Sequence, residues 1–421
     1  MIRTRLGRRS IASALSITVA VAACSSNSDS SPDETIAATA SPTTSVEAPD
    51  GKLTIGVMLP PAATLLRDPI QNGVNAAIRQ VNAAGGLFGR HVPIEWAEEG
   101  DTAETGADAV QTLIDQHVDA IIGPASSTIA PSALTSIVSN GVLACSPTAS
   151  ALSLNDFPDD NLFFRTVPSD SMQAQAISQV ADRTGFASVA IAYVDDGFGR
   201  PLSAAVTDAL ANVPIVVADS IPFASGEGDQ IGVDPVQRVR NSGARVLILL
   251  AGSNDGTQFL EALSEEAMPN LTSIIVNDAL RSSESVQRLA ALPEATREMI
   301  EGVAPQAEST DPDTPFDPPG PFATQAFDCA MLIALAASIA DSDSGANIAA
   351  VLPSISTSGQ PCDTFVACAG AALEPRQINY DGPSGLTDIG STGDPSRARF
   401  DVFSFDETGQ DTWEKTILVP A

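Results

Sequence analysis

The amino-acid sequence predicts an α/β protein with two lobes, each a doubly wound parallel sheet with helices on both faces. Beyond residue 51, short apolar runs rich in Val, Ile and Leu alternate with segments of helical spacing, and this alternation starts again after Arg165. Apolar strands that alternate with helices form parallel sheets covered on both faces. The remaining stretch of about 370 residues is also too long for one ordinary core, which favours two.

The first lobe is predicted from an alternation that begins with a strand over 52–59. Asp68 and Pro69 then supply an N-cap and a first-turn proline, which start a helix, and Gly85 with Gly86 ends it. The further elements are a strand over 91–96, a helix over 102–116, a strand over 119–123, a helix through Ile137 and a strand over 142–145.

The second lobe is predicted from four apolar runs separated by helical segments, one of which opens with Asp234 and Pro235. The strands lie over 188–193, 214–218, 245–251 and 273–276. Two later segments break the pattern. The proline-rich stretch over 305–321 is interpreted as a surface excursion near a crossing between the lobes. The apolar stretch over 326–340 contains Asp328 and Cys329 and is interpreted as a buried core helix.

The N-terminal segment carries signals for export. Four arginines within the first nine residues precede an apolar stretch over 11–23, which at about 13 residues is too short to span a bilayer that requires ~20. Residues 21–24 (VAAC) resemble the lipobox of bacterial lipoproteins. We therefore expect a signal peptide over 1–23 and a lipidated Cys24 that starts a disordered tether over 24–51. The protein is then extracytoplasmic and lipid-anchored to the outer face of the cell membrane.

The net charge of the chain argues against two kinds of binding partner. A formal net charge of −31 argues against nucleic acid, whose phosphates require a basic face. It argues equally against electrostatic docking on anionic lipid. We therefore expect contact with the membrane through the lipid anchor only.

The sequence contains no recognisable catalytic or metal-binding pattern. His91 and His117 are not spaced as metal ligands, no Cys-x-x-Cys occurs, and no glycine-rich phosphate loop follows a strand. We therefore expect no metal, no cofactor and no enzymatic activity. One alternative, a hydrolase with Ser127 or Cys145 as nucleophile, lacks a suitably placed base.

The four remaining cysteines fall into two groups. Cys362 and Cys368 share one turn-rich segment, and we expect them to form a disulfide in an exported protein. Closing so short a loop stabilises by only ~2–2.5 kcal/mol in the chain-entropy model. Cys145 and Cys329 lie in apolar runs and are interpreted as buried free thiols.

Polar segments at the expected strand ends resemble those of a known family, in the family's order. They are 82–86 (NAAGG), 122–127 (IGPASS), 146–150 (SPTAS), 164–170 (FRTVPSD), 195–199 (DDGFG) and 380–385 (YDGPSG). From residue 52 to 421 the chain thus resembles type I periplasmic binding proteins. It is more closely similar to the leucine/isoleucine/valine-binding-protein-like solute receptors of ABC importers.

The resemblance implies a two-lobed, monomeric receptor with a ligand cleft between its lobes and a multi-strand hinge. Lobe one is expected over 52–167 and 303–396, and lobe two over 168–302 and 397–421. Closure of the lobes over a small-molecule ligand would create the form that an ABC permease recognises. An alternative is a lipoprotein of the same fold that senses its ligand and feeds a signalling partner.

The resemblance also implies a ligand site at the strand ends. Ser127, with Ser126 beside it, matches a serine that holds a ligand carboxylate at a helix start, and Thr148 and Ser150 complete this clamp. Asp278 matches an acidic residue that pairs with a ligand ammonium. The alternative interpretation of these residues is ordinary helix capping and turn formation.

Three positions depart from the family pattern. Phe198 stands where many relatives have tyrosine, Ser253 lies near a second family tyrosine, and Leu66 replaces an aromatic residue. Phe198 can cover a ligand but cannot donate an O–H bond. The polar clamp is therefore better preserved than the side-chain pocket, and the ligand is left open between an amino acid, a small amide and another carboxylate.

Overall fold

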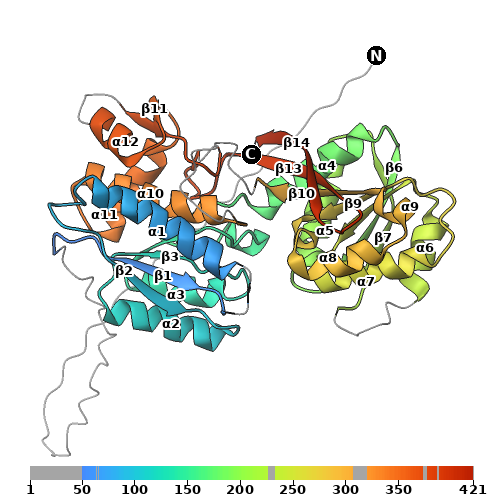
Figure 1. Ribbon diagram of the computed structural model, residues 1–421, viewed down its shortest axis with the longest axis horizontal. Coiled ribbons are helices and arrows are strands. Elements are labelled where there is room, and N and C mark those ends of the chain that lie inside the picture. Colours follow the sequence, from blue (N-terminus) through green and yellow to red (C-terminus); the bar gives the residue numbers. More distant parts are fainter. Residues whose placement is uncertain are drawn as a thin grey trace, which may run out of the picture. The chain divides into compact units, whose positions relative to one another are not determined.

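The computed structural model describes residues 50–62, 64, 66–225, 233–306, 320–372, 377–385 and 388–420. Their strands form two large sheets and one two-stranded sheet, and helices pack on both large sheets (Figure 1). The expected signal peptide over 1–23, Cys24 and nearly all of the tether over 24–51 lie outside the described residues. The same is true of 307–319 in the proline-rich segment.

The first sheet has five parallel strands in the order β2-β1-β3-β4-β5. They are β1 (Ile55–Leu59), β2 (Ile94–Glu98), β3 (Ala120–Ile122), β4 (Leu143–Ser146) and β5 (Phe163–Arg165). All strands except β2 are buried at every position, as expected for a sheet covered on both faces.

Helices cover both faces of the first sheet. The elements are α1 (Arg67–Ala83), α2 (Ala103–Asp115), α3 (Ala130–Ser139), α10 (Ala323–Ala340) and α11 (Gly345–Val351), with short helices η1 (Leu152–Leu154) and η3 (Leu352–Ile355). α1 and α10 pack with Val57 and Ile122 in one hydrophobic cluster, whereas α2 and α3 pack with Met58 and Ile121 in another. Successive strand residues therefore serve opposite faces.

The ends of α1 agree only in part with the prediction. Leu66, rather than Asp68, occupies the N-cap, and its side chain makes no capping hydrogen bond. Asp68 lies inside the first turn, where a carboxylate still suits the helix dipole. The helix ends as expected, with Gly86 at φ +75° donating its N–H to the carbonyl oxygen of Val81.

α10 confirms the expected core helix. Every residue from 323 to 337 is buried, which explains why the segment is apolar on most sides. Within the described residues α10 is the one helix long and apolar enough to cross a membrane, and 83% of it is buried inside the protein. Gly73 permits the close crossing of α1, because a Cβ there would lie 2.1 Å from the carbonyl oxygen of Ala323.

The structure contains two disulfides, and one of them overturns an expectation. Cys145 of β4 is bonded to Cys329 of α10, so the interpretation of these residues as free thiols is wrong. Their separation of 184 residues hides a proximity that arises only when α10 packs on the sheet. Cys362 is bonded to Cys368, the pair expected from the sequence.

The Cys362–Cys368 segment is more regular than a turn. Cys362 ends β11 (Gln360–Cys362), and Cys368 lies in α12 (Phe365–Ala372). β11 pairs in parallel with β12 (Ile378–Tyr380) to form the two-stranded sheet.

The second sheet has seven strands in the order β14-β13-β10-β9-β8-β6-β7. They are β6 (Ser188–Val194), β7 (Val216–Phe223), β8 (Val246–Leu250), β9 (Ser273–Asn277), β10 (Ile300–Pro305), β13 (Arg397–Phe405) and β14 (Asp411–Pro420). β6 to β10 are parallel, as predicted. β13 and β14 form an antiparallel hairpin at one edge, so this sheet is not parallel throughout.

Helices cover both faces of the second sheet as well. They are α4 (Asp170–Arg183), α5 (Gly199–Leu210), α6 (Val233–Ser242), α7 (Ser253–Ser264), α8 (Ser283–Ala291) and α9 (Glu294–Arg297), with a short helix η2 (Asp278–Leu280). α4 and α5 contribute to one hydrophobic cluster, and α6, α7 and α8 to the other. Two α/β lobes with parallel sheets are therefore confirmed.

Candidate ligand-binding site

Two neighbouring loops on the first sheet bring four of the expected residues together. Ser126 and Ser127 follow β3, and Thr148 and Ser150 follow β4, which is paired in parallel with β3. The hydroxyl of Thr148 donates to the carbonyl oxygen of Ala125 at 2.7 Å. These loops lie at the carboxyl ends of their strands, where open parallel sheets bind ligands.

Ser127 retains unused hydrogen-bonding capacity. Its Oγ accepts a bond of 3.3 Å from the N–H of Ala151, which leaves the hydroxyl hydrogen free to donate. Ser126 instead behaves as a local cap, because its Oγ accepts from the N–H of Thr128 and its carbonyl oxygen from Ala130, the first residue of α3. Of the two serines, Ser127 is the better placed to hold an anion at a helix start.

The hydroxyl of Thr148 mainly stabilises the two loops and has little capacity left for binding a ligand. Its side chain is 8% exposed, and its hydroxyl hydrogen is used by Ala125. Ser146 fastens the same loops, because its Oγ donates to the carbonyl oxygen of Pro124 at 2.6 Å and accepts from the N–H of Ala149 at 2.9 Å. Thr148 can therefore reach a ligand only through its remaining acceptor capacity.

Glu99 lies beneath this loop pair and was not predicted as a site residue. It follows β2, is 1% exposed, and its Oε2 accepts from the N–H of Ala125 at 2.8 Å. Burial raises its pKa to about 7, while hydrogen bonds from the backbones of Ala125 and Ser126 oppose the shift. The only sequence signal is an acidic pair, Glu98 and Glu99, at the end of a strand.

Three expected residues follow strands of the second sheet. Phe198, Ser253 and Asp278 come after β6, β8 and β9, and β8 lies between the other two strands. The hydroxyl of Ser253 donates to the carbonyl oxygen of Ala279 at 2.7 Å, which joins the loops after β8 and β9.

Phe198 and Leu66, which stand at aromatic positions of the family pattern, both take part in hydrophobic packing. Phe198 is half-buried and packs against both hydrophobic clusters of the second sheet. Leu66 packs against the cluster between the first sheet and α1. These contacts are typical of a core residue at the start of a helix.

Asp170 is the second residue that the sequence did not single out, although it ends a family-like segment. It is the first residue of α4, is 6% exposed, and its N–H donates to the carbonyl oxygen of Ser150 at 2.9 Å. Burial raises its pKa to about 6, a hydrogen bond from the Ser150 side chain opposes this, and the negative charge of Asp278 raises it further.

Asp278 lies against the first turn of α4. Its Oδ1 accepts from Gln173 Nε2 at 2.8 Å, and Gln173 is one helical turn from Asp170. Burial raises the pKa of Asp278 also. Among the described residues neither carboxyl forms an ion pair with an Arg or Lys. The charge of Arg165 lowers the pKa of Asp170 in part, but burial still leaves both pKa values raised.

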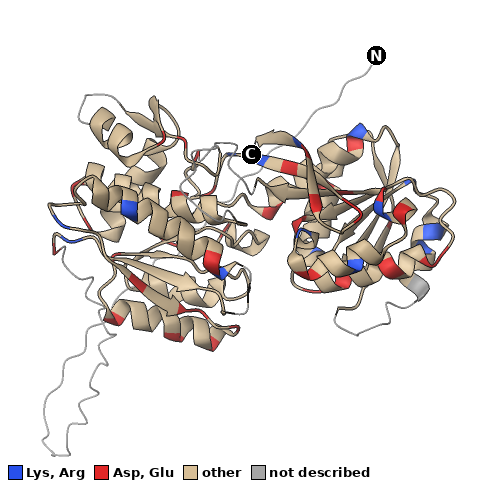
Figure 2. Cartoon of the chain, viewed as in Figure 1, with Lys and Arg blue, Asp and Glu red and all other residues tan. Residues whose placement is uncertain are grey.

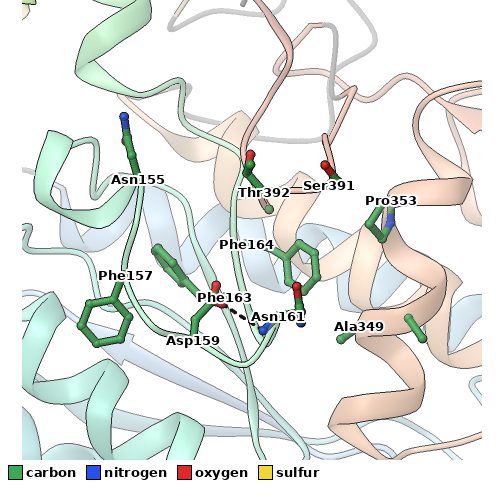
Figure 3. Close-up of a pocket in the computed structure, with 12 residues that line it drawn as sticks. Asn155, Phe157, Asp159, Asn161, Phe163, Phe164, Ala349, Pro353, Ser391 and Thr392 are labelled. Carbon is green, nitrogen blue, oxygen red and sulfur yellow. Dashed lines mark hydrogen bonds between the residues drawn. The ribbon is translucent and has the colours of Figure 1, made fainter. Parts of the chain in front are cut away.

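A separate cavity of about 460 Å³ lies in the first lobe (Figure 3). Its wall combines the aromatic residues Phe157, Phe163 and Phe164 with Asn161 and Ser391. It includes none of the eight residues expected to bind ligand, and it therefore does not belong to the loop pair described above.

Two features of the described residues bear on metal binding and on thiol chemistry. Within the described ranges no group of three or more His, Cys, Asp or Glu side chains could hold a metal ion. Cys145 cannot act as a thiol nucleophile while its sulfur is bonded to Cys329. Acidic residues occur on helices, strands and loops of both lobes (Figure 2).

Comparison with known proteins gives a match over most of the chain. A family model described as periplasmic binding protein matches residues 53–375. The substrate-binding protein BasB of a chemotactic signal transduction system in Halobacterium salinarum is 26% identical over 360 residues, covering 82% of this chain and 84% of BasB. The Leu/Ile/Val-binding protein BraC3 of Rhizobium johnstonii is 27% identical over 175 residues, covering 40% of this chain and 47% of BraC3.

Solved structures share the fold. The branched-chain amino acid transporter substrate-binding protein LivJ of Streptococcus pneumoniae, solved in complex with isoleucine, superimposes with a TM-score of 0.65. The two sequences are 18% identical, and the match covers 88% of this chain and all of LivJ (100%).

Proposed function

The chain belongs to the periplasmic binding protein family, and we propose that it is a solute receptor for a branched-chain or related small amino acid. The observation that carries this proposal is the polarity of the site. Donors at the start of α3 suit an anion, whereas Asp170 and Asp278 are buried carboxyls that suit a cation. An amino acid carries both charges.

The carboxylate of the ligand is proposed to bind the first-sheet loops. Ser127 would donate its hydroxyl and its backbone N–H, neither of which donates to another described residue. Ser150 lies on the adjoining loop and Thr148 holds that loop in place. Hydrogen bonds to a charged ligand group are worth ~1.5–3 kcal/mol each.

The ammonium of the ligand is proposed to bind Asp278, with Asp170 as a second carboxyl nearby. A cation between them would stabilise both ionised forms, since burial leaves the pKa of each carboxyl raised. Phe198 and Leu66 offer apolar surface and no hydroxyl, which suits an aliphatic side chain.

Hinge closure is proposed as the response to ligand. Two of the segments near the expected lobe boundaries, at Thr166 and Gln306, are each hydrogen-bonded to Gln325 of α10, which supports a defined hinge. Thr166 donates to the carbonyl oxygen of Gln325 at 2.9 Å, and Gln325 donates to that of Gln306 at 2.9 Å. A ligand that binds the closed form more tightly shifts the population toward it.

The cellular setting is part of the same proposal. A lipidated Cys24 would anchor the protein to the outer face of the cell membrane, and the tether would let a monomeric receptor dock on an ABC permease. A sensing role in place of transport is the second candidate, and the relative BasB, named for a chemotactic signal transduction system, favours it.

A thermal-shift series on the full chain tests the proposed ligand class. L-leucine should stabilise the protein by ~2.7 kcal/mol at 100 times its Kd. L-leucinamide lacks the carboxylate and 4-methylpentanoate lacks the ammonium, so each should shift the unfolding temperature far less. Equal shifts with L-leucine and 4-methylpentanoate would point to a carboxylate receptor instead.

A further inference from the structure

Glu99 is a buried acidic side chain next to the loop that follows β3. It is 1% exposed, and within the described residues no Arg or Lys forms an ion pair with it. Its burial costs desolvation free energy that its hydrogen bonds from the loop offset only in part, since its pKa is raised to about 7. A strained titratable group of this kind is frequently found at a functional site.

Its hydrogen bonds lead directly to the proposed carboxylate clamp. Glu99 Oε2 accepts from the N–H of Ala125 at 2.8 Å, and the carbonyl oxygen of the same residue accepts from Thr148 at 2.7 Å. Ala125 is thereby held on both sides, from β2 below and from the loop after β4.

The neighbouring positions of this loop are held as well. The carbonyl oxygen of Pro124 accepts from Ser146, and that of Ser126 accepts from Ala130. The N–H of Ser127 makes no hydrogen bond to another described residue. The backbone polar groups of 124–126 are therefore occupied, and the first unoccupied backbone N–H on the loop is that of Ser127.

We propose that Glu99 is a positioning residue that holds the loop over 124–127 so that the N–H and O–H of Ser127 converge on a ligand carboxylate. This inference rests on the proposed function for its ligand. Glu99 does not touch the ligand and acts through Ala125. Preorganised donors bind an anion more tightly because the ordering of the loop is completed before binding.

The geometry distinguishes two substitutions at this position. Glu99→Gln keeps an oxygen that can accept from Ala125, and it removes the buried charge. Glu99→Ala removes the acceptor altogether. Glu98→Ala is the matched control, because Glu98 is the adjacent residue, is exposed, and bonds Arg67 rather than the loop.

Hydrogen exchange on the unliganded full chain tests the positioning step without reference to any ligand. Glu99→Ala should accelerate exchange at least tenfold in peptides covering 123–130, with Glu99→Gln and Glu98→Ala within threefold of wild type. Unchanged exchange in the Ala variant would overturn the proposal, as would a uniform acceleration across the whole chain.

Calorimetry with L-leucine and L-isoleucine tests the consequence for binding. Glu99→Ala should weaken the affinity about tenfold or more while the protein stays folded with a modestly lower unfolding temperature, because the buried N–H of Ala125 loses its acceptor. Glu99→Gln should restore the affinity to within about threefold. Accelerated exchange with undiminished affinity would overturn the positioning role. If neither amino acid binds wild type but exchange responds as stated, the proposed ligand class fails and the loop-holding role of Glu99 stands.

Discussion

Buried carboxyls are the most informative single residues of this protein. The pKa of Asp328 is raised to about 7 by burial, although Tyr380 donates its O–H at 2.6 Å and Ser384 its N–H at 2.9 Å. Glu99 and Asp170 are raised to about 7 and about 6 for the same reason. In all three the protonated form is favoured by folding.

These shifts predict that stability falls as pH rises. Between the unfolded values of about 4 and the folded values of 6 to 7, the folded state holds more protons than the unfolded state, so the free energy of unfolding decreases. Chemical denaturation at pH 5 and pH 8 should show the protein more stable at pH 5.

The net charge of −31 also opposes folding at high pH, so a variant must separate the two causes. Asp328→Asn should reduce the pH dependence, and Asp68→Asn, at an exposed position of α1, should leave it unchanged. An equal slope in both variants would assign the effect to overall charge.

The sequence identified some site residues and missed others for a physical reason. Ser127, Thr148, Ser150 and Asp278 are small polar residues at strand ends, a pattern that parallel sheets make informative. Glu99 lies in a segment whose composition is typical of a solvated turn. Its burial becomes evident only from the packing of the neighbouring loop. The sequence likewise could not show that the Ser127 hydroxyl is free to donate a hydrogen bond, or that the Thr148 hydroxyl donates to the protein itself. Both facts depend on three-dimensional contacts.

At the scale of secondary-structure elements, strands and helices could be predicted from the sequence where both of their faces are buried. The core helix α10 and most of the strands coincide with the expected runs, namely β1, β3, β4, β6, β8 and β9. β2 and β7 overlap the expected runs only in part, and β5 and β10 were not among the expected strands. The β13–β14 hairpin was not recognised, because β14 is mostly exposed and lacks the continuous apolar pattern of a buried strand. The Cys145–Cys329 bond was missed because sequence separation carries no information on which helix packs over which strand.

The two disulfides should differ in their effect on stability. In the chain-entropy model, a bridge across 184 residues constrains the unfolded chain more than one across 6, by about 5 against ~2–2.5 kcal/mol. Urea denaturation of Cys145→Ala/Cys329→Ala should therefore show a larger loss than Cys362→Ala/Cys368→Ala. The reverse order would indicate that residual structure in the unfolded state, rather than loop closure, sets the effect.

At the scale of the whole molecule, the alternation of strands and helices was sufficient to predict two α/β lobes. It was insufficient to predict the strand order, which decides which loops are neighbours. β3 pairs with β4, and β8 lies between β6 and β9; these pairings bring residues distant in sequence to shared sheet edges. Only a resemblance to a known family could supply that order in advance.

Membrane attachment is a prediction of its own, since Cys24 lies outside the described residues. Two or more acyl chains hold a protein firmly to a membrane, so Cys24→Ala should move the protein from the membrane fraction to the soluble fraction of cells. Ser25→Ala is the neighbouring control. A Cys24→Ala protein that still requires detergent for extraction would contradict lipid anchoring.

The central claim is that Ser127 holds the carboxylate of an amino acid, and titration calorimetry with L-isoleucine tests it most directly. Ser127→Ala should raise the Kd roughly 10- to 100-fold. Loss of its bond from Ala151 should cost unliganded stability no more than about 1 kcal/mol. A Ser127→Ala protein that binds L-isoleucine as tightly as wild type would contradict the account.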